Sequence, residues 1–300
     1  MVAFEAPSEL PRDAVSDTTL GRTSGVEEDR VDTGDTVGAT TGETVEEWAR
    51  AYVESTSLAH KCTPPPAPLR WAEAPSPCDP RPGRPPELRV SLAKPRSVKL
   101  GALRAPEARA RLLHKFWHHE LQAAELMCWA LLRFPDTEPE FRRGLVRICR
   151  DEIRHMGLYQ RHIEALGYRV GAFPVRDWFW ERVPTCETPV QFVALLGMGF
   201  EAANLEHTPR FATWFRAVGD EAGAVLQERV GREEVGHVRF ATRWFRRWTN
   251  GGDFDTWCAS LPPPLTPLLL RGKTIQRERR LLAGMDAAFI DRLEAWRPSP

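Results

Sequence analysis

The sequence lacks several features that would assign it to a familiar chemical class. None of its six cysteines belongs to a Cys-x-x-Cys pair, which argues against a zinc knuckle or a thioredoxin-like site. It contains no Gly-x-Gly-x-x-Gly, no P-loop and no Gly-x-Ser-x-Gly motif. The scattered cysteines are therefore interpreted as mostly buried thiols in a reducing compartment.

Excess charge and long apolar runs are also missing. The 41 Lys and Arg residues balance 41 Asp and Glu residues, and the resulting net charge of zero argues against broad binding to nucleic acid. The longest uninterrupted apolar stretch, residues 192–200, is too short to span a bilayer, so no membrane partner is expected. The first residues lack a basic segment followed by an apolar one, so we expect no secretory signal and predict a cytoplasmic location.

The N-terminal third of the chain consists of three segments that differ in composition. Residues 1–42 hold nine acids and three bases among many Gly and Thr residues, which predicts an acidic disordered tail. Thr44 and Glu47 form a capping-box pattern at the start of one expected amphipathic helix over 44–61. Residues 63–97 are Pro-rich and basic, which predicts an extended segment that wraps another surface. The helix and this wrapping segment together form the predicted N-terminal unit, 43–104.

Four long helical patterns follow, and strand patterns are weak throughout. The patterns cover about 105–133, 137–166, 187–206 and 217–248. The third meets Pro209, and we expect it to end before that residue. The connections within each pair are short, whereas about twenty residues join the second pattern to the third.

Two helix hairpins joined by one long crossover predict an all-α, ferritin-like four-helix bundle over residues 105–250. Residues 251–300 are expected to form a C-terminal helical extension. The 42% hydrophobic composition, with 11 Trp and 14 Phe, is enough for a sizeable core.

Each of the four patterns carries an acid inside an apolar stripe. An unpaired carboxylate in such a place would be costly, so something positive must compensate it. The polar members of the stripes are Glu120 in the first pattern, Glu152 and His155 in the second, Glu201 in the third, and Glu234 and His237 in the fourth.

The spacing of these residues is duplicated. Glu120 precedes Glu152 by 32 residues, and Glu201 precedes Glu234 by 33. Each half therefore reads Glu, a long spacer, then Glu-x-x-His, which indicates that each hairpin supplies half of one site. Four carboxylates would be neutralised by two divalent cations, and carboxylate with imidazole suits iron or manganese.

Over about 105–248 the chain resembles the ferritin-like di-metal carboxylate proteins. The motif DEIRH, residues 151–155, is similar to the second-helix motif of bacterial di-iron hydroxylases. More narrowly, HHELQAAEL, VGDEAGAVL, EEVGHVRFATRWF and the N-terminal TVEEWARAYVESTSLAHK resemble an uncharacterised bacterial ferritin-like family, domain of unknown function 455. This narrower likeness extends over most of the chain after residue 43.

The resemblance implies a site for two iron ions, with manganese or a mixed iron–manganese pair as the alternative. Its implied ligands are Glu120, Glu152, His155, Glu201, Glu234 and His237. Asp151 and Glu233 match the acids that hold a metal-bound histidine from the other half of the site, and an acidic acceptor fixes the tautomer of an imidazole. Position 233 departs from the commonest form in having Glu instead of Asp.

Neighbouring polar residues allow other readings. Glu125 and Glu206 each follow a proposed ligand by five residues, a rotation of about 140° that should take them off the face. Tyr159, one turn after a proposed ligand, could be redox-active or bind substrate, and core packing is the alternative. The basic residues between 271 and 280 are expected to form a solvated face.

The predicted function is that of an O2-dependent di-iron oxidoreductase that hydroxylates or dehydrogenates a small organic substrate, with an electron donor as a further partner. One alternative is iron handling, as a ferroxidase or storage protein. Another is a non-enzymatic interaction protein that keeps the metal site for stability. The sequence leaves the substrate, the electron donor and the oligomeric state open.

Overall fold

The computed structural model describes residues 43–93 and 98–298. Within these ranges the chain is all-helical, and one isolated parallel bridge, Val90 to Val175, stands in place of a sheet. The predicted disordered tail, 1–42, lies outside the described residues, as do 94–97 of the predicted Pro-rich segment and 299–300 of the predicted C-terminal extension.

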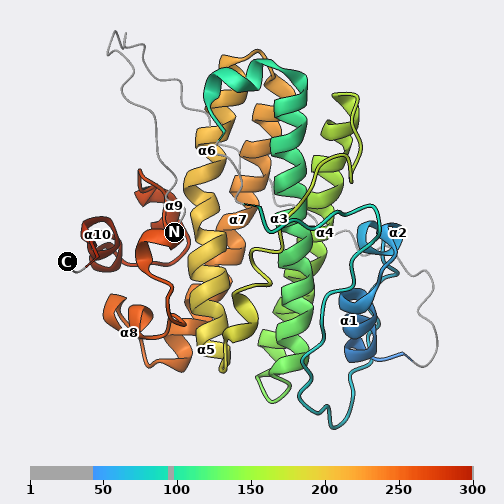
Figure 1. The fold of residues 1–300 in the computed structure, drawn as a ribbon. Coiled ribbons are helices and arrows are strands. Elements are labelled where there is room, and N and C mark those ends of the chain that lie inside the picture. Colours follow the sequence, from blue (N-terminus) through green and yellow to red (C-terminus); the bar gives the residue numbers. More distant parts are fainter. Residues whose placement is uncertain (1–42, 94–97, 299–300) are drawn as a thin grey trace, which may run out of the picture.

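Long helices pack in pairs along the molecule (Figure 1). Helix α3 (Pro106–Arg133) pairs with α4 (Pro139–Ala165), and α6 (Ala202–Ala217) pairs with α7 (Glu221–Trp248). The two pairs meet where α4 contacts α7. A long connection, residues 166–188, joins α4 to α5 (Pro189–Phe192), and we refer to it as the crossover.

Local chemistry explains where these helices begin and end. Pro106 and Pro139 occupy the first helical positions of α3 and α4, where a missing N–H costs nothing. The Asp220 side chain caps α7 by accepting a 2.8 Å hydrogen bond from the Gly223 N–H. Helix α4 ends just before Gly167, whose φ of +84° suits glycine. The predicted ranges 105–133, 137–166 and 217–248 agree with these bounds to within four residues.

The third helical segment differs from its prediction. It consists of α5, a π-helical stretch η3 (Val193–Glu201), and α6, which continues through Pro209 to Ala217. The expected end before Pro209 is wrong. Proline removes one backbone hydrogen bond, but Phe211 and Phe215 in the following turns are buried against the core, and this packing outweighs the local penalty.

The predicted single helix over 44–61 is also wrong in part. Thr44 and Glu47 form the expected capping box at the start of α1 (Val45–Glu54), but a second helix, α2 (Leu58–Cys62), begins after a break. The Ser57 side chain accepts a hydrogen bond from the His60 N–H, so it caps a new helix instead of continuing the old one.

Segments from the two ends of the described chain flank the long helices on opposite sides (Figure 1). Helix α1 packs on α3 and α2 on α4. The Pro-rich stretch after α2 is extended, and Gly83 approaches the end of α1 so closely that a Cβ there would lie 2.1 Å from the Glu54 carbonyl oxygen. On the other side lie α8 (Phe254–Ala259), α9 (Arg277–Leu282) and α10 (Ala287–Ala295), with α9 touching α6 and α7.

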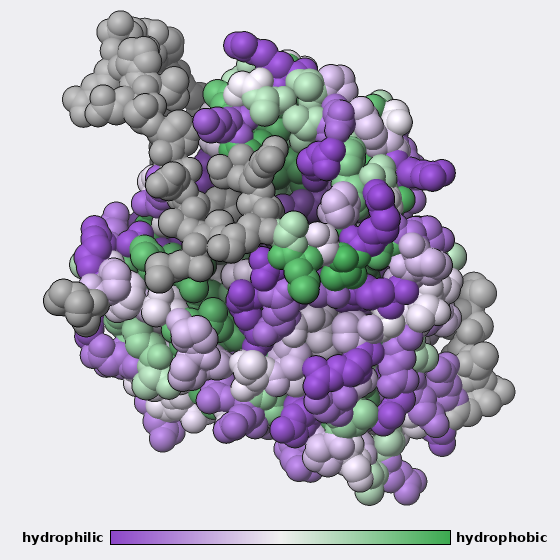
Figure 2. Space-filling model, viewed as in Figure 1, coloured by the Kyte–Doolittle hydropathy of each residue, from purple (hydrophilic) through white to green (hydrophobic). Residues whose placement is uncertain are grey.

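Hydrophilic residues cover most of the face shown in Figure 2, and apolar residues appear there in small groups. The large aromatic side chains lie inside; Trp48, Trp117, Trp129, Trp244 and Trp257 are at most 2% exposed. Within the part of the chain that the structure describes, no helix is both long enough and apolar enough to cross a membrane.

Candidate metal centre

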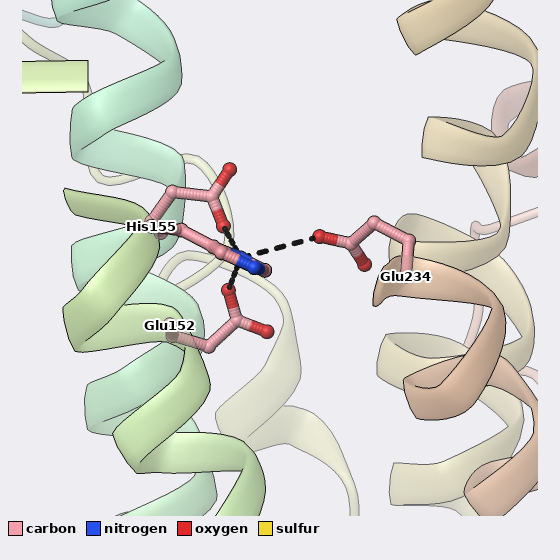
Figure 3. Close-up of side chains that lie close together, drawn as sticks. Glu152, His155 and Glu234 are labelled. Carbon is pink, nitrogen blue, oxygen red and sulfur yellow. Dashed lines mark hydrogen bonds and ion pairs between the residues drawn. The ribbon is translucent and has the colours of Figure 1, made fainter. Parts of the chain in front are cut away.

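Six buried side chains converge between the two helix pairs. Figure 3 shows Glu234 pointing from α7 toward Glu152 and His155 on α4. Every member of the cluster is at most 5% exposed. Its members are Glu120, Glu152, His155, Glu201, Glu234 and His237, the residues whose spacing is duplicated in the sequence.

The cluster divides into two overlapping groups. Ligand atoms of Glu120 and His155 lie with those of Glu152 and Glu234, all within 4.8 Å of one another. Ligand atoms of Glu201 and of His237 form the second group with the same two carboxylates, within the same distance. Glu152 and Glu234 therefore belong to both groups, and each group could hold a metal ion.

The two imidazoles face the shared carboxylates with the same nitrogen. The Nδ1 atom of His155 lies 3.3 Å from Glu152 Oε2 and 3.8 Å from Glu234 Oε1. The Nδ1 atom of His237 lies 2.8 Å from Glu152 Oε1 and 3.5 Å from Glu234 Oε2. The arrangement is thus nearly symmetric, as two copies of one helical motif would produce.

Electrostatics in the cluster favour bound cations. Burial, together with the neighbouring Glu152 carboxylate, holds the pKa of Glu120 well above its usual range, and burial with Glu234 does the same to the pKa of Glu201. Both Glu234 oxygens and one Glu201 oxygen are buried without a hydrogen-bond partner, while Glu152 Oε1 and His237 Nδ1 face each other at 2.8 Å. Such acceptors are costly unless positive charge meets them, so the donor set fits divalent cations.

An acid from the opposite motif supports each imidazole. His155 Nε2 lies 2.6 Å from Glu233 Oε2, and His237 Nε2 lies 3.5 Å from Asp151 Oδ2. The hydrogen bond with His155 lowers the pKa of Glu233 to about 2. An acceptor at Nε2 favours the tautomer that leaves Nδ1 free to face the carboxylates.

Asp151 gives a test of this support. We expect Asp151→Asn to fold and still bind metal, but with an Fe(II) affinity reduced by roughly 10–100-fold, because the charged acceptor for His237 is lost. Glu140→Gln on the same helix is the matched control, since Glu140 is exposed and pairs only with Arg143 among the described residues. Equal Fe(II) affinities in Asp151→Asn and wild type would reduce Asp151 to a surface acid paired with Arg154, worth about 0–1 kcal/mol.

Glu125 is buried but lies outside the cluster. Its carboxylate meets Lys61 Nζ of α2 and Arg84 Nη1 of the Pro-rich segment, each at 2.7 Å. Trp180 of the crossover donates a further 2.7 Å hydrogen bond to it. This ion cluster ties the N-terminal unit to α3.

Glu206 of α6 is likewise a buried acid outside the cluster, and it binds the C-terminal segment. It accepts two 2.8 Å hydrogen bonds from Arg280 of α9, and the Gly272 and Gln276 backbone N–H groups donate to the same carboxylate. Arg280 is 0% exposed, so the expectation of a solvated face over 271–280 is wrong at this residue. No local pattern could reveal these partners, because Arg84 and Glu125 are 41 residues apart and Arg280 and Glu206 are 74 apart.

Tyr159 packs in the core beside the cluster. Its ring lies 5.8 Å from that of Phe116, and its hydroxyl accepts a 3.3 Å hydrogen bond from Gln227 Nε2. Burial, with the Glu120 and Glu234 carboxylates nearby, raises the pKa of Tyr159 well above its usual range. Its redox or substrate-binding role stays a prediction.

The π-helical stretch η3 ends at Glu201. Gly197 lets this stretch approach α7 closely, because a Cβ at that position would lie 2.2 Å from the Ala241 Cβ. A cavity of about 10 Å³ lies beside Glu201 and His237, and the rest of its lining is apolar except for the Gly197 backbone. That volume is space for roughly one water-sized molecule. The apolar lining residues are Met127, Ile148, Phe192, Val193, Phe240 and Ala241.

Residues 37–291 match the family described as Protein of unknown function (DUF455), and the chain belongs to this family. It is also similar to an uncharacterized protein of Haemophilus influenzae, at 28% identity over 162 residues. That alignment covers 51% of this chain and 56% of the relative, so the chain spans about half the length of the curated relative it matches. No solved structure matches the chain significantly.

Proposed function

We propose that this protein is a ferritin-like di-metal oxidoreductase that uses O2 to hydroxylate or dehydrogenate a small organic molecule. The observation that carries the proposal is the convergence of two closely similar half-sites. Helices α3 and α4 contribute Glu120 and one Glu-x-x-His motif, and η3 and α7 contribute Glu201 and the other, to a single buried cluster. Within the proposal, residues 105–250 form the ferritin-like bundle, and 43–104 and 251–300 are units attached to it.

The donor set supports iron or manganese as the bound metal. Four carboxylates and two imidazoles, with no thiolate among them, suit these ions better than copper or structural zinc. Glu152 and Glu234 would be shared by both ions, while Glu120 with His155 and Glu201 with His237 would complete the two groups. When bound, a pair of such ions would supply the electron-transfer chemistry that O2 reduction requires.

The surrounding residues would orient and shield this centre. Glu233 and Asp151 would hold the two imidazoles in one tautomer, so that both Nδ1 atoms stay directed at the shared carboxylates. The largely apolar cavity beside Glu201 and His237 has space for roughly one water-sized molecule and would keep bulk water away from the centre. This combination favours controlled oxidation over solvent-exposed metal storage.

Oxygen consumption tests the proposal. Protein loaded with Fe(II) under anaerobic conditions is expected to take up O2 rapidly when mixed with aerated buffer, and Glu234→Ala is not. Uptake that continues in proportion to each further addition of Fe(II), with ferric iron retained, would instead assign the protein to iron handling. Stable metal binding without O2 uptake would contradict the oxidoreductase and favour a metal-stabilised interaction protein.

A further inference from the structure

Two buried thiols lie side by side between α3 and α4. The Sγ atoms of Cys128 and Cys149 are 3.5 Å apart, and the two residues are 2% and 0% exposed. All six cysteines are free in this structure. A disulfide bond needs a sulfur–sulfur distance of about 2.05 Å, so the pair would close by an approach of about 1.5 Å.

The thiol pair adjoins the candidate metal centre. Cys149 precedes Glu152 by three residues on α4, so the two side chains lie on neighbouring positions of one helix face. Burial, then the contact with Cys128, raises the pKa of Cys149 well above its usual range, and the Glu152 carboxylate adds to this. The pair is therefore enclosed, and Cys149 lies within one helical turn of a carboxylate shared by both metal groups.

We propose that Cys128 and Cys149 form a redox-active dithiol that donates two electrons to the chemistry of the metal centre. The inference rests on the proposed function and names the electron donor for it. Because both sulfurs are buried, oxidants in bulk solvent reach them poorly, while Cys149 lies within one helical turn of Glu152. Burial thus directs the oxidation of the pair toward the site.

The electrons and atoms balance for a hydroxylation. Two S–H bonds break and one S–S bond forms, which releases two electrons and two protons. One oxygen atom of O2 enters a C–H bond of the substrate, and the other leaves as water with the two protons. The net change is substrate, O2 and dithiol to alcohol, water and disulfide. The dithiol thus supplies the two electrons of a single turnover.

Thiol counting tests the inference directly. The full-length protein is reduced, loaded with Fe(II) without oxygen, and exposed to O2. It is then denatured and alkylated, and its mass and peptide map are measured. No substrate is present, so the four electrons that take O2 to two waters would come from the dithiol and the two loaded Fe(II) ions. Wild type is expected to lose two alkylatable thiols per chain, with the peptides of Cys128 and Cys149 linked. Cys258→Ala, which removes a partly exposed cysteine, should lose the same two thiols. Cys128→Ala and Cys149→Ala should form no such link.

Metal content and O2 uptake, measured on the same samples, separate the two proposals. A protein that binds metal and consumes O2 while all six cysteines stay alkylatable would overturn the dithiol and leave the proposed function standing. A link that also forms in Glu234→Ala under the same conditions would overturn the coupling to the metal centre. A wild-type protein that binds no metal would overturn the proposed function, and the dithiol would lose its electron acceptor with it.

Discussion

Glu152→Ala is expected to abolish metal loading. Glu152 belongs to both ligand groups, and its two oxygens lie 3.3 Å from His155 Nδ1 and 2.8 Å from His237 Nδ1. Its removal therefore takes a carboxylate from both candidate ligand groups at once. Elemental analysis after anaerobic loading should fall from about two ions per chain to a small fraction of one. Glu234→Ala should behave in the same way, since Glu234 is the other shared carboxylate.

Glu140→Ala is the matched control for this experiment. Glu140 lies on the same helix but is exposed and paired with Arg143. Its replacement should leave metal content at the wild-type level. A Glu152→Ala protein that holds as much metal as Glu140→Ala would show that Glu152 is not a ligand shared by the two groups.

The largest stability effect is expected from Arg280→Met. Arg280 is 0% exposed and donates two 2.8 Å hydrogen bonds to the buried Glu206. Its removal leaves a carboxylate inside the protein without its cation, which typically costs about 3–5 kcal/mol of unfolding free energy. Chemical denaturation in urea measures this loss. Lys61 and Arg84 share the equivalent Glu125, so removing either one alone should cost less.

Arg277→Met provides the control, because Arg277 lies on the same helix but is exposed and pairs with Asp291 at the surface. Such a surface pair contributes about 0–1 kcal/mol to the free energy of unfolding. Adding Glu206→Gln to Arg280→Met should restore part of the stability, because the amide removes the charge and keeps an acceptor for the Gly272 N–H. Equal losses in Arg280→Met and Arg277→Met would rule out the buried ion pair.

The polar residues that converge could be found from the sequence because helical periodicity carries the information. An acid or histidine at a position that repeats with apolar residues every three or four places must face the interior. The regular turns of α3, α4 and α7 preserve that relation over their whole lengths. The duplicated spacing of a glutamate and a Glu-x-x-His motif then predicts that both halves contribute to a single site. What those residues bind stays a proposal.

Features that depend on distant contacts could not be found in this way. Nothing near Glu206 in the sequence distinguishes it as the partner of Arg280, and nothing near Glu125 indicates Lys61. Pro209 predicts a helix end by its own chemistry, and only the burial of residues such as Phe215 keeps the helix intact. The π-helical turns before Glu201 depart from the 3.6-residue period on which the sequence patterns rest, so those patterns do not detect them.

The break between α1 and α2 is an intermediate case. Ser57 is a good N-cap residue, but so are many serines that lie inside longer helical patterns. The choice is settled by tertiary contacts: Lys61 donates hydrogen bonds to the Tyr52 and Val53 carbonyl groups and pairs with Glu125. A continuous helix would carry Lys61 away from these partners.

Metal content tests the central claim most directly. Protein purified without chelators and loaded anaerobically with Fe(II) should contain about two transition-metal ions per chain, because four buried carboxylates require about four positive charges. Elemental analysis of the wild-type protein gives this number without any knowledge of the substrate. A value near two is the predicted result, and less than about half an ion per chain, with all six side chains intact, would contradict the di-metal centre.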